Sequence, residues 1–234
     1  MKLTFPTIAL LGILTFGCAP VSYVVPTPAP PAPAPVAPIV ELQPIPVPPP
    51  PDPTEKIVNS ISRLGGTGLY GGEQPVNWFC TAFSIAPRKY LTAAHCTLPL
   101  HQLVNGGIKL DGRPAFVVAE DIANDLAIVV TDYVQPTLTI RAALLHKYDK
   151  VQAMGFGYAF TYPIRTDHVV MLLNYSPAEG IAPGTIYLYP FAGGMSGGPV
   201  YDGNGDIVGM VQRSNETVAY GVGSDVIQQF LDKN

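Results

Sequence analysis

The sequence predicts an all-β fold, with a closed or nearly closed β architecture and one helix at its C-terminal end. From about Thr54 to Asn234, short apolar or alternating runs are separated by Gly, Pro, Asn and Asp, as in strands joined by turns. Only residues 224–233 show clear helical spacing of apolar side chains. With 234 residues and a hydrophobic fraction of 47%, the chain can bury the core of one substantial domain.

Nine runs in this region are predicted to form strands. They are residues 77–85, 116–119, 126–130, 151–155, 168–173, 185–188, 198–201, 207–212 and 219–222. The sequence Asp-Gly-Asn-Gly at residues 202–205 predicts a hairpin turn between two of them. Ser224 or Asp225 is the predicted N-cap of the C-terminal helix, because a short polar side chain there can bond free amides of the first turn.

Residues 1–17 are predicted to be an export signal and are left out of the fold. After the basic residue Lys2, an apolar stretch ends in the small residue Gly17. This stretch is short for a membrane span of about 20 residues, and Pro6 disfavours a spanning helix.

Cys18 follows, and residues 15–18 (Thr-Phe-Gly-Cys) resemble the lipobox of bacterial lipoproteins, although Thr15 stands where lipoboxes favour Leu. In lipoproteins the signal is cleaved before the cysteine, which then carries acyl chains on its thiol and its new amino group. The resemblance implies a lipid anchor at Cys18, which needs more than one acyl chain to hold stably. The alternative is an ordinary signal peptide in which Cys18 has no special role.

Residues 19–53 consist mostly of Pro, Ala and Val, and are predicted to form a linker in the polyproline-II conformation. At about 3.1 Å per residue, a tract of roughly 35 residues spans up to about 100 Å. The linker would therefore let a domain of residues 54–234 reach through a cell envelope. An inert flexible linker and a ligand for a Pro-binding module are the alternatives.

The overall charge argues against two classes of partner. The formal net charge is −4 and only 13% of residues are charged, so there is no basic stripe. Neither nucleic acid nor an anionic membrane surface is an expected electrostatic partner.

Two segments offer an acid–base pair. His95 follows Ala93 and Ala94, whose small side chains let the backbone turn tightly beneath the imidazole, although such a histidine can also be structural. Asp125 opens the apolar run 126–130 and is drawn toward the interior, where an imidazole N–H would satisfy its carboxylate. The alternative is an aspartate that caps a turn, and Asp121 competes for either role.

The run Gly-Gly-Met-Ser-Gly-Gly-Pro at residues 193–199 offers a nucleophile, Ser196. Its glycines permit a tight backbone on which the amides of Gly194 and Ser196 could form an oxyanion hole. An ordinary loop is the alternative. A phosphate cradle is disfavoured because there is no Walker lysine and no following helix.

The three segments in this order, with His-Cys, Asn-Asp-Leu-Ala-Ile and Gly-x-Ser-Gly-Gly-Pro, resemble the chymotrypsin-like (trypsin-fold) serine peptidases over nearly all of residues 57–231. The resemblance implies two six-stranded antiparallel β-barrels of the chymotrypsin type. His95 and Asp125 would come from the first barrel and Ser196 from the second. It also implies hydrolysis of protein substrates through an acyl-enzyme, without a cofactor.

The same resemblance implies a disulfide between Cys80 and Cys96, which in an exported protein would close about 16 residues and contribute roughly 3 kcal/mol. A metal site is disfavoured, because these cysteines and the scattered histidines lack ligand spacing. For the substrate pocket, the family register places Pro190 near the base and residues Gln212, Arg213 and Ser214 on the wall. No acid stands where trypsin-like enzymes bind Lys or Arg. Arg213 favours an acidic substrate side chain or is a solvated rim residue.

One departure from the family concerns activation. Many members have Asp before the serine, which pairs with a new N-terminus released by cleavage, whereas this chain has Met195. The sequence Lys-Ile-Val at residues 56–58, which resembles an activation site, is therefore interpreted as coincidental.

The sequence thus predicts a lipid-anchored serine endopeptidase exported to the periplasm or cell surface. Two alternatives remain, a catalytically inactive protease-like binding module and a structural envelope lipoprotein that acts through its Pro-rich tract. The oligomeric state is left open.

Overall fold

The computed structural model describes residues 52–70, 74–99, 103–142, 145–159, 161–175 and 184–234, all within the compact unit that begins at Pro49. The predicted export signal, Cys18 and the Pro-rich linker up to residue 51 lie outside the described residues. Within the described part of the chain, no helix has the length and apolar character needed to span a membrane.

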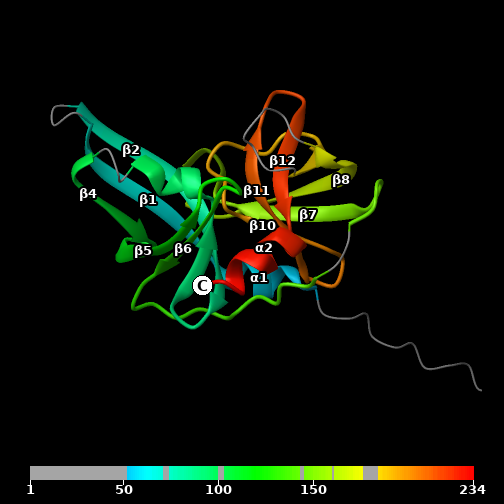
Figure 1. Ribbon diagram of the computed structural model, residues 1–234, viewed down its shortest axis with the longest axis horizontal. Helices are drawn as coiled ribbons and strands as arrows, with labels where there is room; N and C mark the ends of the chain where they lie inside the picture. The colour runs from blue at the N-terminus through cyan, green and yellow to red at the C-terminus, as the bar shows by residue number, and fades with distance from the viewer. Residues whose placement is uncertain (1–51, 71–73, 100–102, 143–144, 160, 176–183) are drawn as a thin grey trace, which may run out of the picture. The chain divides into compact units, whose positions relative to one another are not determined.

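The first six strands form a closed antiparallel barrel, drawn from cyan to green in Figure 1. Around the barrel the order is β1-β2-β3-β6-β5-β4, and β1 closes it by pairing with both β2 and β4. The strands are β1 (Ile61–Tyr70), β2 (Gln74–Ala86), β3 (Lys89–Thr92), β4 (Leu103–Leu110), β5 (Arg113–Asp121) and β6 (Leu126–Val130).

The next six strands form a second closed barrel in the order β10-β11-β12-β9-β8-β7. The strands are β7 (Lys150–Gly155), β8 (Ile164–Tyr175), β9 (Gly184–Leu188), β10 (Pro199–Tyr201), β11 (Ile207–Ser214) and β12 (Val218–Gly223). The structure therefore confirms the predicted pair of six-stranded antiparallel barrels.

Two short helices join the barrels into one hydrophobic unit. Helix α1 (Thr54–Ser60) precedes β1, and α2 (Ser224–Leu231) follows β12. Ile57 of α1 and Phe230 of α2 are buried in the same core cluster as Leu110 of the first barrel and Met210 of the second. Since burial of large apolar side chains contributes about 1.5–3 kcal/mol each, this shared core holds the barrels together.

All nine predicted strands fall on observed strands, but β1, β3, β4 and α1 were not predicted. Their sequences explain the omission. Strands β1 and β4 contain Gly-Gly pairs, which are typical of turns, and β3 has only four residues. Helix α1 has only seven residues, fewer than an isolated helix needs, so its stability depends on tertiary packing.

The predicted N-cap of the C-terminal helix is wrong by one or two residues. The N-cap is Gly223, which keeps the extended backbone of β12 and makes no side-chain capping bond. Ser224 is already the first helical residue, and Asp225 lies in the first turn, where its charge favours the positive end of the helix dipole.

The bond between Lys56 and Ile57, which resembles an activation cleavage site, lies inside α1. Ile57 is fully buried in the core cluster. Just before the helix, Asp52 accepts hydrogen bonds from the amide and hydroxyl of Thr54, and these bonds lower the pKa of Asp52. A protease could reach the Lys56–Ile57 bond only by unfolding α1, which supports the interpretation of this site as coincidental.

Candidate active site

The turn that carries His95 is held at several points. It is the short 3₁₀ turn η1 (Ala94–Cys96), which follows β3 and begins next to the buried Ala93. The predicted disulfide between Cys80 and Cys96 is present and ties η1 to β2. Trp78 of β2 adds a hydrogen bond of 2.8 Å from its indole Nε1 to the carbonyl of Cys96. The imidazole itself is 42% exposed, so its position is fixed while its outer edge stays accessible.

Asp125 lies in the turn between β5 and β6, and its carboxylate binds His95 twice. One oxygen, Oδ1, accepts the backbone N–H of His95 at 2.8 Å, and Oδ2 lies 2.8 Å from Nδ1 of the imidazole. The side chain of Asp125 is only 14% exposed. Donation from Nδ1–H to this carboxylate leaves Nε2 as the nitrogen that can accept a proton.

The competing aspartate, Asp121, has a different role in the same turn. Its carboxylate accepts the backbone amide of Asn124 at 3.1 Å and the side-chain amide of Asn124 at 2.6 Å. The turn places Asp125 in a left-handed conformation with φ of 54°, which is uncommon for a residue other than glycine. Asp121 therefore stabilises the turn, whereas Asp125 contacts the imidazole.

Ser196 lies in the loop between β9 and β10, and glycines shape this loop. Gly194 and Gly197 have φ angles of 96° and 81°. A Cβ atom on Gly194 would lie 2.5 Å from the carbonyl oxygen of Phe156, and one on Gly197 would lie 2.2 Å from that of Thr81. The loop therefore needs glycine at both positions, for backbone conformation and for space.

The hydroxyl of Ser196 donates to the carbonyl of Gln212 at 2.8 Å. Among the described residues, this is the only hydrogen bond of the Ser196 hydroxyl, and none joins it to His95. Ser196 nevertheless lies beside the His95 turn, because its carbonyl oxygen is 3.9 Å from Sγ of Cys96. A rotation about χ1 changes the acceptor of such a hydroxyl, and hydrogen bonds of this kind often tighten only when substrate is bound.

The two amides predicted for the oxyanion hole are available. Among the described residues, no acceptor bonds the backbone N–H of Gly194 or of Ser196. The predicted nucleophile and both amides thus share one loop, next to the His95–Asp125 pair.

Of the four residues predicted to bind substrate, Pro190 belongs to this loop, and Gln212 and Ser214 contact it through hydrogen bonds. Gln212, almost fully buried on β11, donates from its side chain to the carbonyl of Asn124 at 2.7 Å, which links the second barrel to the turn of Asp125. Ser214 donates to the carbonyl of Phe191 at 2.8 Å. Pro190 and Arg213 are exposed. The side chain of Gln212 is therefore engaged between the barrels, and its carbonyl faces Ser196.

One cluster of possible metal ligands lies in the site. Atoms of Cys80, His95 and Cys96 lie within 4.8 Å of one another. The two sulfurs are bonded to each other, so neither is a thiolate that could bind a metal ion. The donor set does not fit a metal centre.

Comparison with known families identifies the family of this chain. Residues 80–210, more than half of the chain, match the trypsin-like peptidase domain, and the match includes His95, Asp125 and Ser196. The chain belongs to the trypsin-like peptidases. No curated protein sequence matches this peptidase.

Solved structures agree with this assignment at the level of the fold. The active form of the Rv3671c protease from M. tuberculosis is 19% identical, with a TM-score of 0.64 over 86% of this chain and 94% of that one. An HtrA-type protease, an AlgW variant with a decapeptide, is 15% identical, with a TM-score of 0.65 over 77% of this chain and 65% of that one. An inactive form of Rv3671c is 19% identical, with a TM-score of 0.61 over 77% and 90% of the two chains.

Several residues that shape the site were not predicted from the sequence. Trp78 and Thr81 lie on β2 with Cys80, and Asn124 precedes Asp125. Their contacts with the site join residues 18, 113 and 88 positions apart in the chain. The one signal in the sequence for Thr81 is its position directly after Cys80, a residue of the predicted disulfide.

Proposed function

We propose that this trypsin-like peptidase is a serine endopeptidase in which His95, Asp125 and Ser196 form the catalytic triad. The observation that carries the proposal is the double contact of Asp125 with the backbone amide and the Nδ1 of His95. This contact holds the imidazole with Nε2 toward the accessible side, as a general base requires.

The proposed reaction begins when the hydroxyl of Ser196 leaves the carbonyl of Gln212 and donates to Nε2 of His95. Ser196 Oγ then attacks the scissile carbonyl carbon, and its proton passes to Nε2. The amides of Gly194 and Ser196 stabilise the oxyanion. His95 returns the proton to the leaving amine, which yields the acyl-enzyme, and water hydrolyses that intermediate in the second half of the reaction.

The substrate is a protein or peptide, and we place its primary side chain near Pro190 and the backbone of β11 at residues 212–214. The side chain of Gln212 is bonded to Asn124, so its contribution would come from its backbone carbonyl. Arg213 is exposed and would favour an acidic residue if its side chain turned toward the pocket. Cleavage of a peptide library, with Arg213→Gln beside the wild type, decides whether this preference exists.

The inactive binding module is the less supported alternative. All three triad residues are present, two are in contact, and the loop glycines that the oxyanion hole requires are intact. A module without turnover does not require this arrangement.

The proposal is tested on the full mature chain with a fluorophosphonate probe and a broad peptide library. We expect covalent labelling and peptide cleavage by the wild type, and neither by Ser196→Ala. A wild-type protein that resists the probe and cleaves no peptide would leave the binding module as the better description.

We also propose that the peptidase is exported and anchored by acyl chains on Cys18, with the Pro-rich linker as spacer. The support is the resemblance of residues 15–18 to a lipobox. We expect mass spectrometry to find a mature N-terminus at an acylated Cys18 in the membrane fraction, and Cys18→Ser to release the protein from membranes. An unmodified Cys18, or an N-terminus elsewhere, contradicts the anchor but not the enzymatic activity.

A further inference from the structure

In the nucleophile loop, the carbonyl oxygens of residues 192–196 each accept a hydrogen bond. The pattern matters because the C=O and N–H groups of a trans peptide point in opposite directions. The carbonyls of Gly193 and Met195 share their peptides with the amides of Gly194 and Ser196, so the bonds that hold these two carbonyls turn the two amides the opposite way. The bonds run from Met195 N to Ala192 O (3.1 Å), Tyr158 N to Gly193 O (2.5 Å), Thr81 Oγ1 to Gly194 O (3.0 Å), Gly198 N to Met195 O (2.8 Å) and Thr81 N to Ser196 O (2.8 Å).

Two of these five donors belong to Thr81, which comes from the other barrel. Thr81 is fully buried on β2, directly after Cys80 of the disulfide. Its amide donates to the carbonyl of Ser196 and its hydroxyl donates to the carbonyl of Gly194, so one residue fixes the peptides that follow both predicted oxyanion-hole amides. The remaining carbonyl of Thr81 accepts the hydroxyl of Thr92 on β3, which fixes Thr81 within the first barrel.

The hydroxyl of Thr81 also accepts a hydrogen bond, from the amide of Phe156 at 2.9 Å. Phe156 opens the short segment that leads to Tyr158, and Tyr158 has a left-handed backbone with φ of 49°. The amide of Tyr158 holds the carbonyl of Gly193, which belongs to the same peptide as the amide of Gly194. The hydroxyl thus supports the Gly194 amide in two ways, through the carbonyl of Gly194 in the following peptide and through the segment that places the amide of Tyr158.

The residue before the nucleophile offers no charged contact that could hold the loop. Met195 is fully buried in the core cluster of the second barrel and has no charge, so it can form no ion pair with a new N-terminus. The loop conformation must therefore come from neutral hydrogen bonds that exist in the folded chain from the start.

We propose that Thr81 is a positioning residue that holds the oxyanion hole in its productive conformation through its side-chain hydroxyl. The inference rests on the proposed serine endopeptidase activity. Thr81 does not touch the reacting atoms. It acts through Gly194 and Phe156. Its hydroxyl, which donates one hydrogen bond and accepts another, takes the place of the ion pair that an aspartate before the serine forms in other family members.

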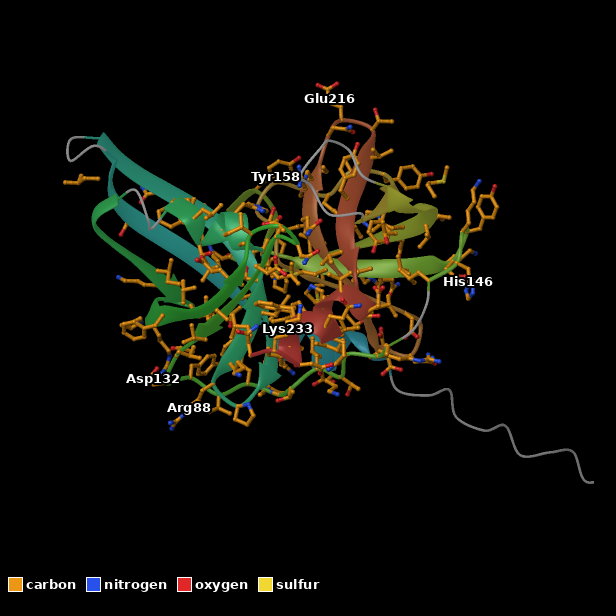
Figure 2. The ribbon with its side chains drawn as sticks, viewed as in Figure 1. Arg88, Asp132, His146, Tyr158, Glu216 and Lys233 are labelled. Atoms are coloured by element: carbon orange, nitrogen blue, oxygen red, sulfur yellow. A yellow bond between two sulfur atoms is a disulfide. The ribbon has the colours of Figure 1, made fainter. Side chains whose placement is uncertain are left out.

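The test compares Thr81→Ser with Thr81→Ala, which both lose the methyl group and differ only in the hydroxyl. Thr131→Val is the control for loss of a buried hydroxyl, since Thr131 is buried and donates to the carbonyl of Pro114 at 2.9 Å. Thr131 adjoins Asp132, which Figure 2 shows well apart from Tyr158.

We expect Thr81→Ala to lower kcat by about 10- to 100-fold with little change in KM, because the lost support weakens an interaction made mainly in the transition state. Affinity for a peptide boronate, whose tetrahedral adduct occupies the oxyanion hole, should fall by a similar factor. Thr81→Ser should stay within about threefold of the wild type, as one hydroxyl replaces another. Thr131→Val should leave both quantities unchanged.

A second measurement reports on the loop without turnover. Amide hydrogen exchange of residues 192–198 should be faster in Thr81→Ala than in Thr81→Ser and the wild type, and unchanged in Thr131→Val. If the wild type proves active and Thr81→Ala matches Thr81→Ser in kcat, boronate affinity and exchange, the inference is overturned. If the wild type has no activity, the proposed function fails, and the exchange difference alone decides whether Thr81 holds the loop.

Discussion

The two barrels contribute to the site in different ways. The first barrel supplies His95 and Asp125 on short turns that are fixed by a disulfide, by the indole of Trp78 and by two bonds from one carboxylate. The second barrel supplies Ser196 on a glycine-rich loop, and two of the bonds that shape this loop come from Thr81 of the first barrel.

This difference indicates that the proposed base, His95, and the proposed orienting acid, Asp125, are held together within one barrel. The nucleophile and its amides, in contrast, depend on the contact between barrels. Changes confined to the first barrel should therefore leave the oxyanion hole intact unless they reach β2 near Thr81.

The largest expected effects are on the triad. Ser196→Ala and His95→Ala should each lower kcat by roughly 10⁴- to 10⁶-fold, and the double variant should be little worse, because the residues act as a unit. Steady-state kinetics on a cleaved peptide measures this. Each variant must keep the melting temperature of the wild type, and additive losses would contradict a shared mechanism.

The two aspartates of the β5–β6 turn provide a matched pair. Asp125→Asn should be nearly as damaging as loss of His95, since it favours the wrong imidazole tautomer. Asp121→Asn should lower kcat by less than about tenfold, because Asp121 contacts Asn124 and not the imidazole. Equal losses in the two variants would show that the turn, and not the Asp125 carboxylate, limits the reaction.

The contact between barrels is tested by Gly197→Ala. Its left-handed backbone costs a non-glycine residue about 1–2 kcal/mol, and the new methyl group would collide with the backbone of Thr81 and Ala93. We expect a loss of at least that much unfolding free energy and at least about 100-fold in kcat. Gly203→Ala, in an open turn with no atom within 4 Å of the new Cβ, should change stability by less than about 0.5 kcal/mol. If Gly197→Ala has the same melting curve as the wild type, the close approach of Gly197 to the backbone of Thr81 and Ala93 is contradicted.

The disulfide tests how the first barrel is held together, at a point where Cys80 directly precedes Thr81 on β2. Replacing Cys80 and Cys96 by Ser should lower the unfolding free energy by about 3 kcal/mol, while folded protein keeps most of its kcat. Urea denaturation of the oxidised and reduced wild type beside the double variant measures this. Reduction should destabilise only the wild type, and free alkylation of either native thiol would contradict the bridge.

The smallest expected effect concerns alkaline stability. Burial raises the pKa of Tyr90 in the first barrel and of Tyr201 in the second to about 12 each. In the unfolded chain tyrosine ionises near pH 10. The neutral buried tyrosines therefore contribute fully to the unfolding free energy below about pH 10, and this contribution is lost as the pH rises from about 10 to about 12. The fall in unfolding free energy above pH 10 should be smaller in Tyr90→Phe than in the wild type, whereas Tyr148→Phe, at an exposed position, should behave like the wild type. Parallel alkaline slopes for all three proteins would contradict the role of burial.

Much of this arrangement could be predicted from local sequence signals. His95, Asp125 and Ser196 each stand in a distinctive short segment, and most strands are bounded by turn residues. The glycine-rich β1 escaped prediction because Gly65 and Gly66 look like a turn, although Gly66 is required where the ring of Trp78 packs against β1. The choice between Asp121 and Asp125 needed the hydrogen bonds themselves.

Thr81 illustrates what local patterns cannot provide. A threonine between a cysteine and an alanine on a strand is unremarkable, and its importance follows from segments 75 and 113 residues further along the chain. Contacts of this kind depend on the docking of two barrels, for which the sequence has no local signature.

The way the chain enters the domain has a mechanical consequence for an anchored enzyme. Pro53 packs against Gly205, where an added Cβ would lie 2.5 Å from that of Pro53, and Ile57 is fixed in the core shared by both barrels. Tension along the tether would therefore be borne by α1 and this core, and would bypass the loop of Ser196. If the proposed anchor holds, tension from the envelope would act on the domain without displacing the proposed nucleophile, Ser196.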